Sequence, residues 1–128
     1  MQEDPAEREI ADKILKSIEE AYGFVPLVNR VLSERPDKFI PMANLGKAVL
    51  DGRGELDKKT RYLAAVAAAT ALGGQHCIRV QMEHAAQAGA TKDEILETIL
   101  IGAYMSMTRC QSYALREFEE RFGNKEEP

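Results

Sequence analysis

The chain has 128 residues, of which 45% are apolar and 30% charged, with a formal net charge of −4 at pH 7. This length suits one domain with a hydrophobic core. Its basic residues are scattered among acids, whereas a nucleic-acid binder usually shows a basic patch. There is no apolar signal-peptide segment, and the longest apolar run, residues 63–72, is shorter than the roughly 20 residues of a membrane span. We therefore expect a cytoplasmic protein that binds neither nucleic acid nor membrane.

Helix signals dominate the first part of the chain. Residues 6–21 predict an amphipathic helix, which Gly23 ends because glycine adopts the left-handed cap at little cost. Pro26 suits the first turn of a short helix that runs to residue 32. Pro36 opens the next helical stretch, and Pro41 is expected to kink or restart it. The apolar face of the first helix consists of Ile10, Ile14, Leu15 and Ile18.

The second part of the chain begins after the clearest loop, residues 51–54. Asp57 is a good N-cap for a helix running to about Leu72, and this helix is apolar nearly all round, which predicts burial against several neighbours. Thr91 and Glu94 form a capping box for a later helix. The remaining helices are expected over 75–88, 92–107 and 110–122. We predict an all-α bundle of about six or seven helices, with a single domain over 1–128, a core at about 10–122 and a frayed tail at 123–128.

One helix start carries the residues of chemical interest. Gly73 and Gly74 break the chain just before His76 and Cys77, so Cys77 falls in the first turn of a helix. The helix dipole and the unpaired N–H groups there favour an anion, which stabilises a thiolate. Gln81 and His84, four and seven residues further on, project from the same helix face as Cys77, and His76 leaves from an adjacent face.

The order of these features resembles the carboxymuconolactone decarboxylase / alkylhydroperoxidase D family. An alanine-rich helix is followed by a glycine break, a His-Cys pair that opens a helix, and then Ala-Gly-Ala-Thr-Lys-Asp-Glu-Ile at 88–95. The resemblance covers roughly residues 10–120 and is strongest over 76–97. It implies the all-α fold of that family and a homo-oligomer, either a trimer or a hexamer. The two most apolar helices, 63–72 and 95–107, agree with an oligomer because they carry more apolar surface than a small bundle hides easily.

Redox members of the family carry a C-x-x-C-x-x-x-H core, often with a histidine before the second cysteine, and an acidic residue on the preceding helix. The resemblance implies that their cysteines cycle between thiol and disulfide while the acid and the histidine relay protons. In this chain Cys77 matches the second cysteine and His76 the histidine before it. The other three positions hold Gly74, Gln81 and Tyr62. Glycine supplies no thiol, glutamine shuttles no proton, and tyrosine, with a pKa of about 10, is a poor base.

The first functional hypothesis is a thiol-dependent oxidoreductase of the alkylhydroperoxidase or peroxiredoxin type. Cys77 would attack a peroxide or a disulfide, with His76 or His84 as base or electrostatic partner. The oxidised sulfur would be resolved by Cys110, by a cysteine of another subunit or by a small thiol. The plain structural reading of Cys77, as a small apolar residue in a helix interface, stays open.

Two further hypotheses use the same residues differently. In a non-catalytic binding or assembly protein, Gln81 and Tyr62 would be polar ligand contacts. In a lactone decarboxylase-type lyase, Arg79 or Arg109 would hold a carboxylate, although decarboxylase members keep a histidine at the position of Gln81. No cofactor is implied, and no metal site is expected because paired C-x-x-C and H-E-x-x-H patterns do not occur.

Overall fold

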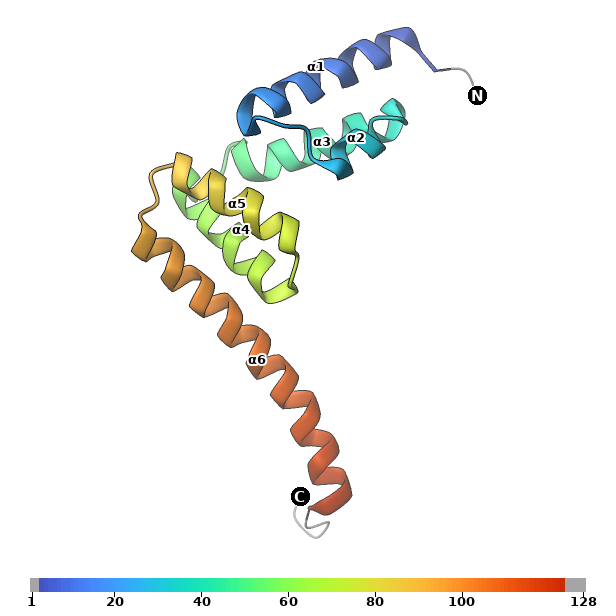
Figure 1. Cartoon of the computed structure of the whole chain (residues 1–128). Coiled ribbons are helices and arrows are strands. Elements are labelled where there is room, and N and C mark those ends of the chain that lie inside the picture. Colours follow the sequence, from blue (N-terminus) through green and yellow to red (C-terminus); the bar gives the residue numbers. More distant parts are fainter. Residues whose placement is uncertain (1–2, 124–128) are drawn as a thin grey trace. The chain divides into compact units, whose positions relative to one another are not determined.

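The computed structural model describes residues 3–123, apart from the side chain of His76, and this part of the chain holds six helices and no strand (Figure 1). The predicted all-α fold is confirmed. By its internal contacts the chain divides into two compact units, the first ending at Glu55 and the second beginning at Leu56. The helices are α1 (Pro5–Tyr22), α2 (Leu27–Leu32), α3 (Pro36–Asp51), α4 (Lys58–Leu72), α5 (Gln75–Gln87) and α6 (Lys92–Phe122).

The first unit consists of α1, α2 and α3, with both α1 and α2 in contact with α3. The side chain of Asp4 caps α1 by accepting from the N–H of Ala6 at 2.9 Å, and Gly23 ends the helix in the left-handed conformation with φ 81°, as predicted. Ala11 of α1 and Phe39 of α3 are fully buried, with 0% and 1% of their surface exposed. The hydrophobic core of this unit therefore lies between α1 and α3.

Pro41 lies inside α3 without restarting it, because the helix is continuous from Pro36 to Asp51. A proline in a helix removes the one hydrogen bond that its N–H would donate to the carbonyl four residues earlier. Here the loss falls close to the amino end of the helix. The loop predicted at 51–54 begins one residue later, because Asp51 is the last residue of α3.

The second unit is built around α4, which packs against α5 and α6. Asp57 caps α4 as predicted, its carboxylate accepting from the N–H of Thr60 at 2.8 Å. The prediction that α4 is buried nearly all round is only partly met. One face is buried, while Leu72 at the helix end is 79% exposed. The buried side chains of α4 are Tyr62, Val66 and Ala69.

The separate helices expected at 92–107 and 110–122 are one helix, α6, of 31 residues. The capping box at its start is confirmed, with Thr91 N donating to Glu94 Oε1 at 2.9 Å and Glu94 N donating to Thr91 Oγ1 at 3.1 Å. The expected break was wrong because the segment Thr108-Arg109-Cys110 contains neither glycine nor proline. At 1.5 Å per residue, α6 is roughly 46 Å long.

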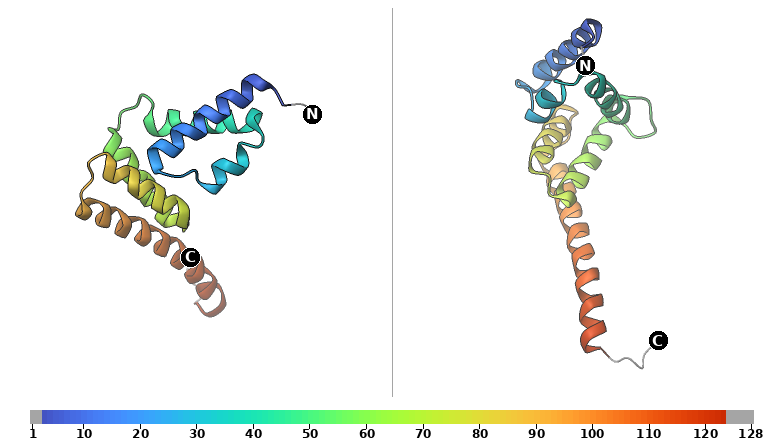
Figure 2. Two further views of the ribbon diagram at one scale, coloured as in Figure 1. Left: turned by 45° about the horizontal axis from the view of Figure 1, so that its top comes forward. Right: turned by 90° about the vertical axis from the view of Figure 1, so that its right-hand side faces the viewer.

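α4 and α6 run in the same direction. Lys59 Nζ and Glu94 Oε2 form an ion pair of 2.9 Å at their starts, and further along Gly102 lies against Ala67 and Thr70. This register places Leu72, the end of α4, level with about residue 106 of α6. The rest of α6 extends past α4 and α5 (Figures 1 and 2), and every residue from 109 to 122 is exposed. Among the helices of residues 3–123, none combines the length and the hydropathy that a bilayer crossing requires.

Candidate functional site

The amino end of α5 is open to solvent. Gly73 ends α4 in the left-handed conformation with φ 74°, and Gly74 is the N-cap of α5 without any side-chain cap. Cys77, the third residue of α5, lies in its first turn as predicted. Its thiol is free, and the residue is exposed. Within the single chain, Cys77 is therefore exposed to solvent and not packed against a neighbouring helix.

Gly74 stands beside Cys77 at the distance of a disulfide partner. A Cβ atom at position 74 would lie 3.5 Å from the Cβ and 3.8 Å from the Sγ of Cys77. Disulfide-bonded cysteines have Cβ atoms about 3.5–4.5 Å apart. The backbone thus retains the spacing of a C-x-x-C pair, and only the first thiol is missing from the sequence.

Further along α5, a histidine ring packs against α4. The rings of Tyr62 on α4 and His84 on α5 lie with centroids 4.7 Å apart, tilted by 55°. Tyr62 is only 4% exposed. The Oε1 atom of Gln81, one turn before His84, is buried and accepts no hydrogen bond from the described residues. The structure therefore brings together two predicted site residues, Tyr62 and His84, between α4 and α5, and Gln81 lies one turn before His84 on α5.

This buried group is separated from the thiol. Cys77 and His84 are seven residues apart on one straight helix, so their Cα atoms lie about 10 Å apart along its axis. A hydrogen bond requires donor and acceptor within about 3.2 Å. Since the His84 ring lies against Tyr62, it is placed to act in the buried group and not on the Cys77 sulfur.

The other predicted site residues are dispersed. Cys110 is a free, exposed cysteine on α6, past the level of Leu72, and no disulfide joins it to Cys77. Arg79 is exposed on α5. The Arg109 guanidinium lies 5.9 Å from the ring centroid of Tyr113, one turn along α6. The side chain of His76 lies outside the described residues, so its predicted role as base stays a prediction.

Sequence reasoning missed two features of the second unit. It named Tyr62 and His84 separately but not their contact, because spacing within a helix carries no information on which residues of two helices meet. It also missed the apolar side chains that α6 exposes on the face away from α4, although their spacing of three and four residues was visible in the sequence. Within residues 3–123, no three metal-ligating side chains of His, Cys, Asp or Glu are grouped.

Comparison with known proteins agrees with this architecture. The model of the carboxymuconolactone decarboxylase family matches residues 36–120, which include all of α4 and α5 and most of α6. No curated protein and no solved structure gives a match. The matched stretch covers two thirds of the chain and contains both the open amino end of α5 and the buried group between α4 and α5. The chain belongs to the carboxymuconolactone decarboxylase family.

Proposed function

We propose that the protein is a thiol-dependent oxidoreductase that reduces a peroxide with Cys77 as its only attacking thiol. The observation that carries this proposal is the exposed, free sulfur in the first turn of α5. A helix amino end presents unpaired N–H groups and a partial positive charge to that turn. The thiolate is the nucleophilic form of cysteine.

The first step is attack of the Cys77 thiolate on one peroxide oxygen. The S–O bond forms as the O–O bond breaks, and the leaving alkoxide takes a proton from solvent. The peroxide is reduced to an alcohol, and the sulfur is oxidised to a sulfenic acid. Because Cys77 is exposed, neither access of the peroxide nor supply of the proton requires the chain to open.

The reductant in this proposal is a small thiol from solution. Its sulfur attacks the sulfenic acid and water leaves, which gives a mixed disulfide at Cys77. A second small thiol then attacks the mixed disulfide, releasing the Cys77 thiolate and a small-molecule disulfide. An external thiol is favoured over an internal one because position 74 holds glycine, and because Cys110 lies on another helix, beyond its contact with α4.

Peroxide consumption in the presence of a small thiol tests the proposal. Cys77→Ser should reduce turnover to the uncatalysed rate. Cys110→Ser is the matched control, since it also replaces an exposed free cysteine by serine, and it should retain the activity of the parent. Equal turnover by Cys77→Ser and the parent would exclude the mechanism, and a loss in Cys110→Ser would transfer the resolving role to that residue.

A second candidate function, ligand binding without turnover, is supported by the buried oxygen of Gln81 on α5. A buried acceptor such as Gln81 Oε1 costs free energy while it accepts no hydrogen bond. A small ligand with a hydrogen-bond donor would relieve that cost. Calorimetric titration with small alcohols and amides tests this, with Gln81→Met as the variant that removes the acceptor and keeps the side-chain length. Binding that is equal in the two proteins would exclude the role of Gln81.

A further inference from the structure

Position 74 leaves an open space on one side of the Cys77 sulfur. Gly74 is the N-cap of α5, and a Cβ atom built on it would lie 3.5 Å from the Cβ and 3.8 Å from the Sγ of Cys77. Among the described residues, no atom beyond its chain neighbours and these two would come within 4 Å of that Cβ. The glycine therefore leaves room for a small group in contact with the sulfur.

The same space lies at the amino end of α5. The N–H groups in the first turn of a helix have no carbonyl partner within the helix, and together with the helix dipole they favour a negatively charged group. The N-cap Gly74 makes no side-chain hydrogen bond to these N–H groups. A small anion beside Gly74 would therefore contact the Cys77 sulfur and the helix end at once.

Charge distinguishes the two molecules that react at Cys77 in the proposed function. Peroxide approaches the exposed sulfur as a neutral molecule, so the helix end does not direct it to one side. The small thiol attacks as a thiolate, which the helix end attracts. We propose that the small thiol that reduces oxidised Cys77 binds in the space left by Gly74, with its charged sulfur towards the first turn of α5. This inference rests on the function proposed above and makes Gly74 a residue that determines which reductants the protein uses.

The bond changes follow from this placement. The thiolate attacks the sulfenic acid from the side of Gly74, the S–S bond forms as the S–O bond breaks, and the leaving hydroxide takes a proton from solvent to become water. Because Cys77 is exposed, that oxygen can leave towards solvent. The Cβ atoms of a disulfide lie about 3.5–4.5 Å apart. The distance of 3.5 Å between the Cβ of Cys77 and a Cβ at position 74 shows that the first carbon of the bound thiol fits in this space.

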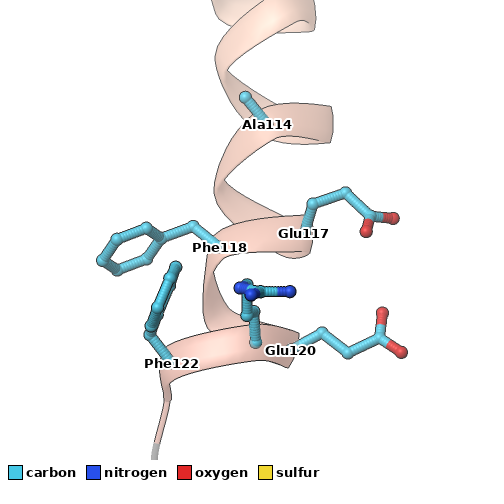
Figure 3. Close-up of a pocket in the computed structure, with 6 residues that line it drawn as sticks. Ala114, Glu117, Phe118, Glu120 and Phe122 are labelled. Atoms are coloured by element: carbon cyan, nitrogen blue, oxygen red, sulfur yellow. The ribbon is translucent and has the colours of Figure 1, made fainter.

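A second hollow, at the carboxyl end of α6, is too far away to hold the reductant. There the rings of Phe118 and Phe122 lie together with centroids 5.3 Å apart, on the other side of the helix from Glu117 (Figure 3). Leu72, two residues before Gly74, is level with about residue 106 of α6. Phe118 is roughly 18 Å beyond this level along the helix. A small thiol bound at that end would not reach the Cys77 sulfur.

The two half-reactions can be measured separately in a Cys110→Ser background, which leaves Cys77 as the only thiol. Equimolar hydrogen peroxide forms the sulfenic acid, which dimedone labelling and mass spectrometry detect. After removal of peroxide, 2-mercaptoethanol forms the mixed disulfide, which mass spectrometry also follows. Gly74→Ala should slow the second step by about tenfold, a usual scale for an extra methyl group in a close contact. The first step should slow much less, because neutral peroxide can approach from other sides.

Two controls isolate the added methyl group. Gly46→Ala is the same substitution at a position where a Cβ atom would meet nothing within 4 Å, and it should leave both steps unchanged. Sodium hydrosulfide is the matched reductant, because its sulfur also attacks as an anion but carries no carbon. Gly74→Ala should therefore slow the reaction with hydrosulfide less than the reaction with 2-mercaptoethanol.

Gly74→Ser is a second variant that fills the same space. Serine is a favoured N-cap residue, so this variant keeps the start of α5 even if alanine weakens it, and circular dichroism of both variants should match that of the parent. Gly74→Ser should slow the second step at least as much as Gly74→Ala, because its hydroxyl also occupies the N–H groups that would hold the thiolate.

The outcomes separate this inference from the function on which it rests. If the parent forms no sulfenic acid at Cys77, the proposed function itself fails. If it does, and both Gly74 variants are reduced at the rate of the parent, the reductant does not use this space and the inference is overturned while the proposed function stands. Equal slowing of the two steps, or of the two reductants, would also overturn it, since either result would indicate a general change in the reactivity of the sulfur.

Discussion

Gly102 and Gly74, both in the second unit, differ in the space that an added side chain would find. At Gly102, in the contact between α4 and α6, a Cβ atom would collide with the carbonyl oxygen of Ala67 and would lie 3.1 Å from the Cβ of Thr70. At Gly74, before α5, a Cβ atom would rest 3.5 Å from the Cβ of Cys77, which is an ordinary contact. The first glycine is required by packing, whereas the second occupies a place where a side chain fits.

The difference separates a position that is set by helix packing from one that lies beside the proposed thiol site. Where α4 and α6 meet, the absence of a side chain lets the two backbones approach closely, so any added atom must push the helices apart. At the amino end of α5, an added side chain would make only ordinary contacts and need not displace its neighbours. A change at Gly74 is therefore expected to alter reactivity with little effect on the fold, and a change at Gly102 to do the reverse.

The largest expected effect is on stability. Gly102→Ala should lower the free energy of unfolding by about 1–3 kcal/mol, the usual cost of forcing an extra methyl group into a packed contact. Urea denaturation followed by circular dichroism measures it. Activity per folded molecule in the peroxide assay should be unchanged, because the amino end of α5 is not altered.

The same substitution at Gly46 is the control. Gly46 lies inside α3, and a Cβ atom there would meet nothing within 4 Å. Alanine is the better helix former by about 0.8–1 kcal/mol, so Gly46→Ala should raise the free energy of unfolding where Gly102→Ala lowers it. Equal effects at the two positions would remove the basis for a close contact at Gly102.

Much of the fold follows from local sequence signals. The left-handed Gly23, the N-cap Asp57 and the capping box of Thr91 and Glu94 each fix a helix end through interactions within a few residues, and all three were predicted. The continuity of α6 was not predicted. Short bundle helices were expected, although no glycine or proline lies near Arg109 to break the helix. The role of Gly102 was also hidden, since it depends on which residues of another helix lie opposite.

The second-largest expected effect is on thiol reactivity, through a substitution at Gly74. Gly74→Cys should form a disulfide with Cys77 on mild oxidation, since the Cβ spacing of 3.5 Å lies within the range of native disulfides. Thiol titration should then find only Cys110 reactive, and mass spectrometry should show the loss of the two thiol hydrogens. The closed loop is short, so the added stability should not exceed about 2 kcal/mol.

Gly73→Cys is the matched control one residue earlier. Gly73 has φ 74°, a conformation that side chains disfavour, and a Cβ atom there would have no neighbour within 4 Å. It should form no disulfide with Cys77 and should destabilise the chain. If all three thiols of the Gly74→Cys variant stay reactive under the same oxidation, positions 74 and 77 do not have the spacing of a disulfide.

The candidate site was predictable only in part. The place of Cys77 in the first turn of a helix follows from two glycines and a helix start, all within a few residues of sequence. The contact between Tyr62 and His84 depends on how α4 and α5 are rotated about their axes, which helical periodicity does not determine. The sequence therefore placed Cys77 correctly in the first turn of a helix but could not show that the His84 ring packs against Tyr62.

The smallest expected effect concerns pH, at the polar start of the contact between α4 and α6. The N–H of Thr91, and then the ammonium of Lys59, hold the pKa of Glu94 below its ordinary value of 4.5. A carboxylate with a lowered folded-state pKa contributes stability above its unfolded pKa, and that contribution is lost as the pH falls through the folded value. Acidification below about pH 4.5 should therefore weaken this end of the contact.

Glu94→Gln separates the charge from the cap, because the amide oxygen can still accept from the N–H of Thr91 while the attraction to Lys59 is lost. The parent should be slightly more stable than this variant at pH 7, and the difference should close as the pH approaches 3. It should also shrink in high salt, since the Lys59 and Glu94 side chains are each 38% exposed and such pairs are screened. Asp57, whose pKa is lowered chiefly by the N–H of Thr60, is intact in both proteins and leaves the difference unaffected. A stability difference that stays constant from pH 7 to pH 3 would mean that the charge of Glu94 does not contribute to the contact, which would then depend on packing at Gly102 alone.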